Sequence, residues 1–260
     1  MAEVKTPAAA GPSGPLTIAD ALAGKRILVT GATGFLGTAL VERLLRSVPG
    51  CEMAVLIRPT RRSDAAARLS REVVRNDCFN RLRAELGDAF DEVVRTRLEA
   101  VAGDVGRDGL GLDADGRRLL ASCDVVVHSA ATVAFDAPLD TAVEVNLLGP
   151  SRVAAAIEEV AGTRQHDHRG ALPTHLVTVS TAYVAGTHQG DATETLATHA
   201  MASGARARTH TTVTTEVDID AEVIAARRLR DDLESASRSP ERLQKFTKGA
   251  HAELGAAGPH

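Results

Sequence analysis

A glycine-spaced turn is the strongest chemical signal in this sequence. Thr30-Gly31-Ala32-Thr33-Gly34-Phe35-Leu36-Gly37 follows the short apolar run Ile27–Val29 and opens a segment with helical periodicity. Gly31 allows a tight turn, Gly34 lets the backbone approach a phosphate without a Cβ in the way, and Gly37 lets helix and strand pack closely. The N–H groups at a helix start lack intrahelical partners, and the helix dipole favours negative charge there. The turn therefore predicts a cradle for the pyrophosphate of a dinucleotide.

The elements around this turn support the prediction. The glycine spacing is GxxGxxG rather than the more general GxGxxG. The neighbouring elements therefore have to show whether the turn binds a dinucleotide. Leu36, Leu40 and Leu44 lie on one face of the following helix, and a second apolar run, Met53–Ile57, comes next, as a βαβ unit requires. The loop residues expected to contact the cofactor are Thr30, Gly31, Thr33, Gly34, Phe35, Leu36 and Gly37.

A basic cluster follows the second apolar run. Arg58 ends that run, with Arg61 and Arg62 close behind, where an NAD-preferring site usually carries a carboxylate for the ribose hydroxyls. A guanidinium at this place suits the 2′-phosphate of NADP(H). We therefore predict NADP(H) as the cofactor with Arg58 as the main contact. The alternative is a solvated cluster at a helix start, because exposed arginine is common.

Two later apolar runs end in residues suited to the rest of the cofactor. Leu98–Val101 leads to Asp104, and Val125–Val127 leads into His128-Ser129-Ala130-Ala131. Ligands of open α/β sheets bind at the carboxyl ends of strands, so Asp104 is expected to accept a hydrogen bond from the adenine amino group, unless it caps the next segment. His128 is predicted to be a packed, hydrogen-bonded histidine rather than a catalytic one. The expected contacts at these ends are Asp104, Val105, Ser129, Ala130 and Ala131.

Strand-like and helical segments alternate from Lys25 to about Gly186, which is typical of a parallel sheet wrapped by helices. The strand-like runs are Ile27–Val29, Met53–Ile57, Leu98–Val101, Val125–Val127 and Leu176–Val179. The predicted fold class is α/β, a doubly wound parallel sheet of the Rossmann type, incomplete at its C-terminal edge and with an appended helical segment. The expected divisions are a flexible leader at 1–24, a cofactor-binding domain at 25–200 and a helical appendage at 201–260.

Local signals outside the sheet region are weaker. Ile18–Leu22 predicts one short helical turn in the leader, and residues 187–215 have no convincing period and are predicted to be a loop. An apolar stripe from Ile219 through Val223 and Ala226 to Leu233 predicts a helix. Pro240 is predicted to be the first residue of a further helix.

Composition excludes several classes of protein. The chain has 30 basic and 34 acidic residues, a net charge of −4, 2% aromatic residues and no tryptophan, so nucleic acid is not an expected partner. Cys51, Cys78 and Cys123 are scattered without ligand spacing, so they are predicted to be reduced packing residues, and no metal site is expected. We expect no membrane span and, without the order of a signal peptide, a cytoplasmic location.

A family resemblance rests on motifs that occur in order along the chain. They are TGxxGFxG at Thr30, GD at Gly103, HxAA at His128, NxxG at Asn146 and the strand-end run Val179-Ser180-Thr181. From Lys25 to about Glu194 the chain resembles the extended short-chain dehydrogenase/reductase superfamily. Within it the chain is most similar to the NADPH-dependent fatty acyl-CoA reductase and thioester reductase branch. The passages typical of that branch are the basic helical stretch Arg68 to Leu82, the run Gly109 to Leu112, the runs His128 to Asp136 and Ala142 to Gly149, and a tail from Glu216 to Gly258 like the helical insertion of actinobacterial members.

The resemblance implies hydride delivery from NADPH to the thioester carbonyl of an acyl-CoA or acyl-carrier-protein substrate, giving an aldehyde or, after a second reduction, an alcohol. Hydroxyl donors near the carbonyl oxygen stabilise the charge that develops there. By resemblance, Thr181 matches the catalytic Ser/Thr of the family, and Asn146 matches the asparagine that holds the active-site helix and a water. An ordinary strand-end hydroxyl and a backbone-satisfying amide are the alternatives.

One departure from the family pattern has consequences. The family's general acid is a tyrosine followed four positions later by a lysine, whereas the single tyrosine here, Tyr183, is followed by Thr187 at that spacing. We therefore expect the chain to stop before that motif and to bind NADP(H) without turnover. A missing edge strand is expected to favour poor solubility or oligomerisation.

Two other interpretations stay open. A nucleotide-sugar epimerase or dehydratase shares the core, but it usually carries an acidic residue where Arg58 stands and lacks the Arg68 to Leu82 stretch. A non-catalytic NADP(H)-binding module that senses redox state would fit a chain without the Tyr/Lys pair.

Overall fold

The computed structural model describes residues 17–134, 136–162, 173–181 and 218–254. The predictions for most of the leader, for the loop at 187–215 and for Tyr183 lie outside these residues. The chain divides into two compact units. The first comprises the chain up to Ala131 together with Leu148–Val179, and the second comprises Thr132–Leu147 together with the chain from Ser180 onward.

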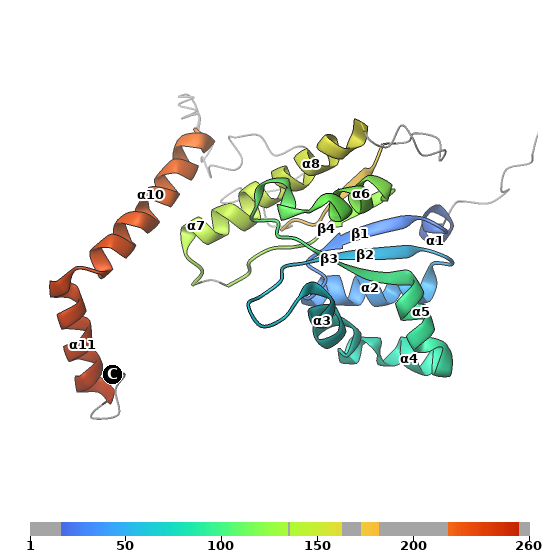
Figure 1. Ribbon diagram of the computed structural model, residues 1–260, viewed down its shortest axis with the longest axis horizontal. Coiled ribbons are helices and arrows are strands. Elements are labelled where there is room, and N and C mark those ends of the chain that lie inside the picture. Colours follow the sequence, from blue (N-terminus) through green and yellow to red (C-terminus); the bar gives the residue numbers. More distant parts are fainter. Residues whose placement is uncertain (1–16, 135, 163–172, 182–217, 255–260) are drawn as a thin grey trace, which may run out of the picture. The chain divides into compact units, whose positions relative to one another are not determined.

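The first unit is built on a parallel sheet of five strands in the order β3-β2-β1-β4-β5 (Figure 1). The strands are β1 Arg26–Thr30, β2 Glu52–Ile57, β3 Leu98–Ala102, β4 Val125–His128 and β5 His175–Thr178. Each strand matches an apolar run that the sequence predicted. The order is that of the Rossmann fold, in which the chain winds outward from β1 in both directions. The predicted fold class is therefore confirmed.

Helices of three kinds connect and flank these strands. The α-helices are α1 Ile18–Leu22, α2 Phe35–Ser47, α3 Ala65–Arg68, α4 Asn80–Leu86, α5 Phe90–Arg97, α6 Ala114–Ser122, α7 Leu139–Ala142, α8 Leu148–Ala161, α10 Ile219–Ser237 and α11 Pro240–Leu254. Short 3₁₀ turns are η2 Asp77–Phe79, η3 Gly87–Ala89 and η4 Asp108–Gly111, and π-helical turns are η1 Leu69–Val74 and η5 Val143–Leu147. The helix near Ile18 and the start at Pro240 agree with the sequence predictions.

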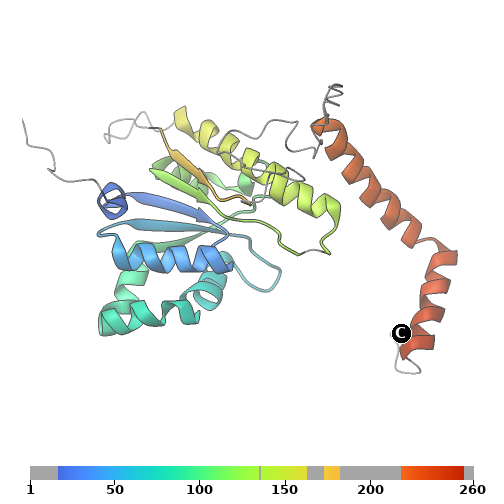
Figure 2. The ribbon, with the colours of Figure 1, turned by 180° about the vertical axis from the view of Figure 1, so that it is seen from behind.

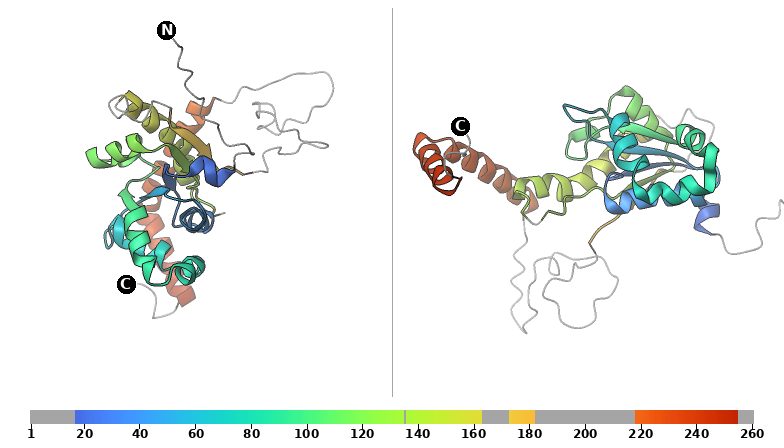
Figure 3. Two further views of the ribbon diagram at one scale, coloured as in Figure 1. Left: turned by 90° about the vertical axis from the view of Figure 1, so that its right-hand side faces the viewer. Right: turned by 90° about the horizontal axis from the view of Figure 1, so that it is seen from below.

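The sheet of the first unit is covered on both faces. Helices α2, α4 and α5 lie on one side and α6 and α8 on the other, as Figures 2 and 3 show from behind and at right angles. Ile27 and Val29 belong to the core cluster on the α2 side, whereas Leu28 and Val126 are buried outside that cluster. Successive strand residues face opposite sides of a sheet, so a strand covered on both faces has to be apolar throughout.

Helix α2 shows how the core ends near the glycine turn. Its buried apolar residues are Val41, Leu44 and Leu45, but Leu36 in its first turn is 49% exposed. The predicted face with Leu36 and Leu44 is therefore only partly buried. The reason is that α2 begins at the carboxyl edge of the sheet, where the core stops and the turn from β1 emerges.

Strand β5 lies at the open edge of the sheet, and the described residues contribute no strand beyond it. Its apolar residue Val177 is 40% exposed, and Val179 directly after it is 44% exposed. Apolar side chains are thus exposed along this edge strand, and the incompleteness of the sheet stays a prediction.

In the second unit, α10 packs against α7 through part of its apolar stripe. Val223 and Ala226 are buried, whereas Ile219 and Leu233 at the ends of the predicted stripe are exposed. Arg227 of α10 forms an ion pair with Glu144 of η5 at 2.6 Å.

Candidate functional site

The glycine turn between β1 and α2 has the geometry that its sequence predicts. Gly31 has a φ of +75°, a backbone conformation that favours glycine. A Cβ on Gly31 would lie 2.6 Å from the Ala130 nitrogen, so the turn is packed directly on the chain that follows β4. A Cβ on Gly37 would overlap the Gly31 carbonyl and lie 2.8 Å from the Ala32 Cα. Both glycines are therefore required by close backbone packing.

Gly34 differs because a Cβ there would meet a less severe contact than at Gly31 or Gly37. It is the N-cap of α2 with an ordinary φ of −89°, and a Cβ on it would meet only the Gly31 oxygen, at 3.3 Å. As a glycine it offers no side chain to cap the first turn of the helix, so a bound phosphate can take that role. Thr33 is exposed, and the Phe35 side chain is 97% exposed. These residues fit a dinucleotide that covers the start of α2.

The end of β3 places Asp104 in a tightly hydrogen-bonded turn. Its Oδ1 accepts a hydrogen bond from the Gly106 N–H at 2.9 Å, and its own N–H donates to the Leu110 carbonyl at 2.8 Å. Leu110 is fully buried and has a φ of +57°, which is costly for a large side chain. Val105 is also buried. Asp104 therefore organises the turn after β3, and its role toward adenine stays a prediction.

Arg58 at the end of β2 lies beside Asp104. Arg58 Nη1 is 3.8 Å from Asp104 Oδ2, and the arginine side chain is 69% exposed. Arg61 and Arg62 are exposed as well. The two predicted contacts to the adenosine half of the cofactor thus come together from neighbouring strands, and the guanidinium is exposed enough to bind an anionic ligand as well.

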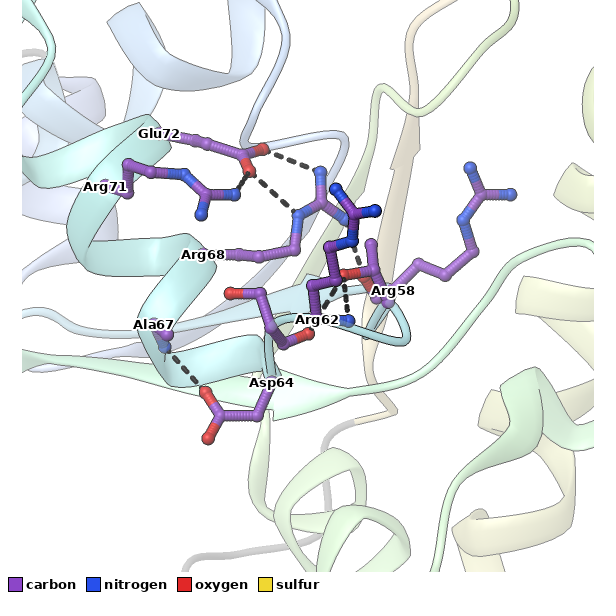
Figure 4. A network of polar contacts seen from close by, with 9 residues as sticks. Arg58, Arg62, Asp64, Ala67, Arg68, Arg71 and Glu72 are labelled. Carbon is purple, nitrogen blue, oxygen red and sulfur yellow. Dashed lines mark hydrogen bonds and ion pairs between the residues drawn. The ribbon is translucent and has the colours of Figure 1, made fainter.

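The backbone of Arg58 is held by a second arginine, as Figure 4 shows. Arg68 Nη1 donates to the Arg58 carbonyl at 2.5 Å, and the same guanidinium binds Glu72 through two hydrogen bonds of 3.0 and 2.6 Å. Arg71 adds a hydrogen bond to Glu72 at 2.7 Å. Arg68 therefore has a structural role. The Arg58 side chain, in contrast, extends away from the Glu72 carboxylate (Figure 4).

This network predicts an acid-sensitive contribution to stability. The hydrogen bonds from Arg68 lower the pKa of the Glu72 carboxyl from 4.5 to about 2. Because the pKa is lower in the folded state, the stabilisation is present above about pH 4.5 and is lost as the pH falls toward 2. Glu72→Gln is expected to reduce the free energy of unfolding by about 1 kcal/mol near neutral pH, with the difference from wild type vanishing toward pH 2. Urea titrations at a series of pH values measure this.

Glu85→Gln is the matched control for the Glu72 variant. Glu85 pairs with Arg81 at the same (i, i+4) spacing, but the two side chains are 46% and 67% exposed. Exposed pairs contribute little, so a pH-independent, near-zero difference is expected. A Glu72 variant that behaves like the Glu85 variant would contradict the assignment.

The end of β4 is joined to the end of β1 by buried polar contacts. His128 Nδ1 lies 2.8 Å from the Thr30 hydroxyl, and both residues are buried. Burial lowers the pKa of His128, which favours the neutral ring. The prediction of a packed, hydrogen-bonded histidine is confirmed. Ser129 and Ala130 are half-buried and Ala131 is exposed, so the chain emerges here at the surface of the first unit.

The predicted catalytic residues belong to the second unit. Asn146 lies in the π-helical turn η5, where its Oδ1 accepts a hydrogen bond from the Thr132 N–H at 2.8 Å and its Nδ2 donates to the Thr132 carbonyl at 2.9 Å. It therefore holds the backbone of the segment after β4, as an amide paired with main-chain groups. Thr181 has an exposed side chain. Its catalytic role stays a prediction.

Replacing Asn146 tests this backbone clamp. Asn146→Ala removes both hydrogen bonds, so the Thr132 amide is expected to exchange with solvent about fivefold to tenfold faster. Asn146→Asp keeps the acceptor but loses the donor, and an intermediate exchange rate is expected. Asn80→Ala, an exposed asparagine of α4 in the first unit, is the control. Unchanged protection of Thr132 in the Asn146→Ala variant would show that the clamp does not form in solution.

Sequence reasoning missed the contacts that connect the predicted residues. It did not identify the partner of His128, the approach of Arg58 to Asp104 or the role of Arg68. A signal for the first was available, because Thr30 and His128 end strands that are neighbours in a Rossmann sheet and are paired in register. The other two depend on side-chain conformations that spacing does not reveal.

Other kinds of site are not found in the described residues. No group of three or more His, Cys, Asp or Glu side chains in residues 17–134, 136–162, 173–181 and 218–254 is arranged to hold a metal ion. Cys51, Cys78 and Cys123 are not joined in disulfide bonds, and Cys51 and Cys123 are buried. None of the helices in the described part of the chain combines the length and apolar character needed to cross a lipid bilayer.

The parallel sheet, the glycine turn at the end of β1 and the uncapped helix start at Gly34 together define a Rossmann-type domain suited to a dinucleotide. Residues 29–250 match the NAD-binding family described as "Male sterility protein", and the chain belongs to that family. The structure shows a cradle for a dinucleotide, and the family match specifies a nicotinamide dinucleotide.

The chain is similar to several proteins that are named as reductases. The chain is 32% identical over 177 residues to fatty acyl-CoA reductase 2, chloroplastic, of Arabidopsis thaliana, which covers 67% of this chain and 27% of the relative. It is 35% identical over 173 residues to fatty acyl-CoA reductase 1 of the same plant, covering 65% and 33%. Among solved structures, the reductase domain of a non-ribosomal peptide synthetase from Mycobacterium tuberculosis is 33% identical, with 61% of this chain and 33% of that chain covered and a TM-score of 0.40. The chain therefore spans about a third or less of the length of these relatives.

Proposed function

We propose that this chain binds NADP(H) and supplies the cofactor-binding part of a reductase that acts on acyl thioesters. The family match from residue 29 to 250 carries the proposal, because the curated relatives named above are fatty acyl-CoA reductases. Arg58 supports NADP(H) over NAD(H), since its exposed guanidinium stands where NAD-specific sites carry a carboxylate. A cytoplasmic location and a role in lipid metabolism belong to the same proposal.

The residues of the first unit serve binding and orientation in this proposal. The open start of α2 receives the pyrophosphate, Arg58 pairs with the 2′-phosphate, and Asp104 accepts a hydrogen bond from the adenine amino group. The small residues Ser129 to Ala131 let the nicotinamide half lie against the backbone.

The chemistry of the proposal is hydride transfer to a thioester carbonyl. The bound cofactor supplies the hydride. Thr181 is proposed to donate a hydrogen bond to the carbonyl oxygen, where negative charge develops during the reaction. Asn146 is proposed to act by holding the backbone at Thr132, as its two hydrogen bonds indicate. The acyl substrate is carried either by CoA or by a carrier protein.

Calorimetric titration of the chain with NADPH and with NADH tests the binding proposal. Binding of NADPH about tenfold to a hundredfold tighter than NADH is expected from one charge-assisted contact to the 2′-phosphate. No heat from either dinucleotide with folded protein would refute cofactor binding, and equal affinities would refute the preference.

A second assay tests the reaction. The product of the full coding sequence is incubated with NADPH and a long-chain acyl-CoA, and nicotinamide absorbance is followed. Oxidation of NADPH that requires the acyl-CoA, with release of free CoA, is expected. Binding of NADPH without such consumption, with CoA and with carrier-protein thioesters alike, would favour a non-catalytic binding module instead.

A further inference from the structure

Helix α10 combines apolar and cationic residues on one of its faces. Arg227 and Arg230 follow Val223 by four and seven positions, and Ala226 follows it by three, so the four residues share a face of the helix. Val223 and Ala226 are buried, and α10 packs against α7. The two arginines therefore belong to the same face as the residues that pack in the second unit.

The segment formed by α7 and η5 supplies matching acidic residues. Asp140 of α7 and Glu144 of η5 are four positions apart, about one helical turn. Arg227 Nε donates to Glu144 Oε1 at 2.7 Å, and its Nη2 lies 2.6 Å from the same oxygen. The pKa of Arg230 is raised, first by its hydrogen bond to Glu234 and then by the charge of Asp140. Two cations of α10 thus match two anions of the α7–η5 segment.

The ion pair between Arg227 and Glu144 is partly shielded from water. The Glu144 side chain is 27% exposed and the Arg227 side chain 51% exposed. Water and salt screen a partly buried pair less than an exposed one. The two residues are 83 positions apart in the chain, so the pair joins segments that local sequence does not connect.

Glu144 stands two positions before Asn146 in the same π-helical turn, η5. Such turns are rare and occur often at functional sites. From this turn the Asn146 side chain reaches the backbone of Thr132, where it accepts from the N–H and donates to the carbonyl. A contact that holds Glu144 therefore restrains the turn that carries Asn146.

We propose that Arg227 is a positioning residue: through Glu144 it holds the η5 turn in the conformation in which Asn146 clamps the Thr132 backbone. Helix α10 of the C-terminal appendage is thereby a support for the segment that carries Asn146. The inference rests on the proposed function only for the part of Asn146 in the reaction.

Replacing Arg227 tests this support in the chain itself. Arg227→Met keeps a long unbranched side chain but removes the charge, so exchange of the Thr132 amide with solvent is expected to become about threefold faster. Arg227→Lys keeps the charge, and an intermediate rate is expected. The amide of Val41, in α2 of the first unit, reports on general stability and is expected to exchange as in wild type. Unchanged exchange at Thr132 in Arg227→Met would overturn the proposal.

Arg228→Met is the matched control. Arg228 is the next residue of α10 and is also exposed, but successive residues of a helix point about 100° apart. This variant removes the same charge from the same helix and is expected to leave exchange at Thr132 unchanged. Equal acceleration by the two variants would show that the loss of one charge from α10, and not the pair with Glu144, controls the exchange.

Combined variants show whether Arg227 acts through Glu144 and Asn146. The double variant Asn146→Ala/Arg227→Met is expected to exchange the Thr132 amide no faster than Asn146→Ala alone. Likewise, Glu144→Gln/Arg227→Met is expected to match Glu144→Gln alone. Factors that multiply in either pair would mean that Arg227 loosens the second unit in some other way, against the proposal.

The product of the full coding sequence tests the consequence for the reaction. With NADPH and a long-chain acyl-CoA, Arg227→Met is expected to lower kcat about threefold and to leave the KM for NADPH unchanged, because the cofactor cradle lies in the first unit. If the wild-type product consumes no NADPH, the proposed function fails, while the exchange measurements still decide whether Arg227 supports Asn146. Faster exchange at Thr132 with an unchanged kcat would overturn the claim that this support serves the reaction.

Discussion

Gly37→Ala is expected to cost about 3 kcal/mol or more of folding stability, a large fraction of the total for a domain of this size. A Cβ at this position would overlap the Gly31 carbonyl and lie 2.7 Å from its carbon, and both are backbone atoms that cannot rotate away. The expected result is a melting temperature lower by roughly 6 to 12 °C. Calorimetry of the cofactor-free chain measures it.

Gly34→Ala is the matched comparison, because it adds the same methyl group three residues earlier. The added Cβ would make a tight contact of 3.3 Å with the Gly31 oxygen, in an ordinary backbone conformation, so the loss of stability is expected to be smaller than for Gly37→Ala. Binding of NADPH is instead expected to weaken by a factor of ten or more, since the methyl group would occupy the space that the phosphate approaches. If the two variants lost stability equally, the distinction between a packing glycine and a ligand-facing glycine would be wrong.

Arg58→Glu is expected to abolish the preference for NADPH, and to reverse it if the affinity for NADH rises. The substitution replaces a guanidinium by a carboxylate that repels a 2′-phosphate and can accept hydrogen bonds from ribose hydroxyls. The affinity for NADPH is expected to fall about tenfold to a hundredfold, while the affinity for NADH stays constant or rises. Parallel calorimetric titrations with the two dinucleotides measure the ratio. An unchanged ratio would remove Arg58 from the site.

Arg81→Glu serves as the control for this charge reversal. The Arg81 side chain is 67% exposed, against 69% for Arg58, but it lies in α4 and pairs with Glu85. It changes the net charge of the protein by the same amount. A similar loss of NADPH affinity in both variants would mean that the overall charge, and not a local contact, controls binding.

Much of the first unit could be predicted from local sequence. The five strands were found from short apolar runs, because strands buried on both faces of a parallel sheet have to be apolar along their whole length. The glycines of the first turn were found from their spacing, since the left-handed conformation of Gly31 and the close packing at Gly37 both exclude larger residues. These features depend on neighbours in the chain.

Contacts between distant residues were harder to predict. The helix after the glycine turn was expected to bury one leucine face, yet Leu36 is half-exposed, because periodicity does not show where the core ends. Asp104 was expected to face adenine or to cap a helix. In the structure its carboxylate accepts from Gly106 and lies near Arg58. Which of these groups the Asp104 carboxylate contacts depends on side chains from other strands, such as Arg58 after β2.

The sequence alone determined the fold class and the place of the cofactor cradle, since each follows from residue types at short spacing, and its ordered motifs indicated the family by resemblance. Only the tertiary structure decided which side chains meet beside that cradle. The hydroxyl of Thr30 and the ring of His128 are 98 positions apart, and their hydrogen bond exists because β1 and β4 are neighbours in the sheet. The physical reason is that strand pairing brings such residues together, and the resulting hydrogen bonds leave no trace in local spacing.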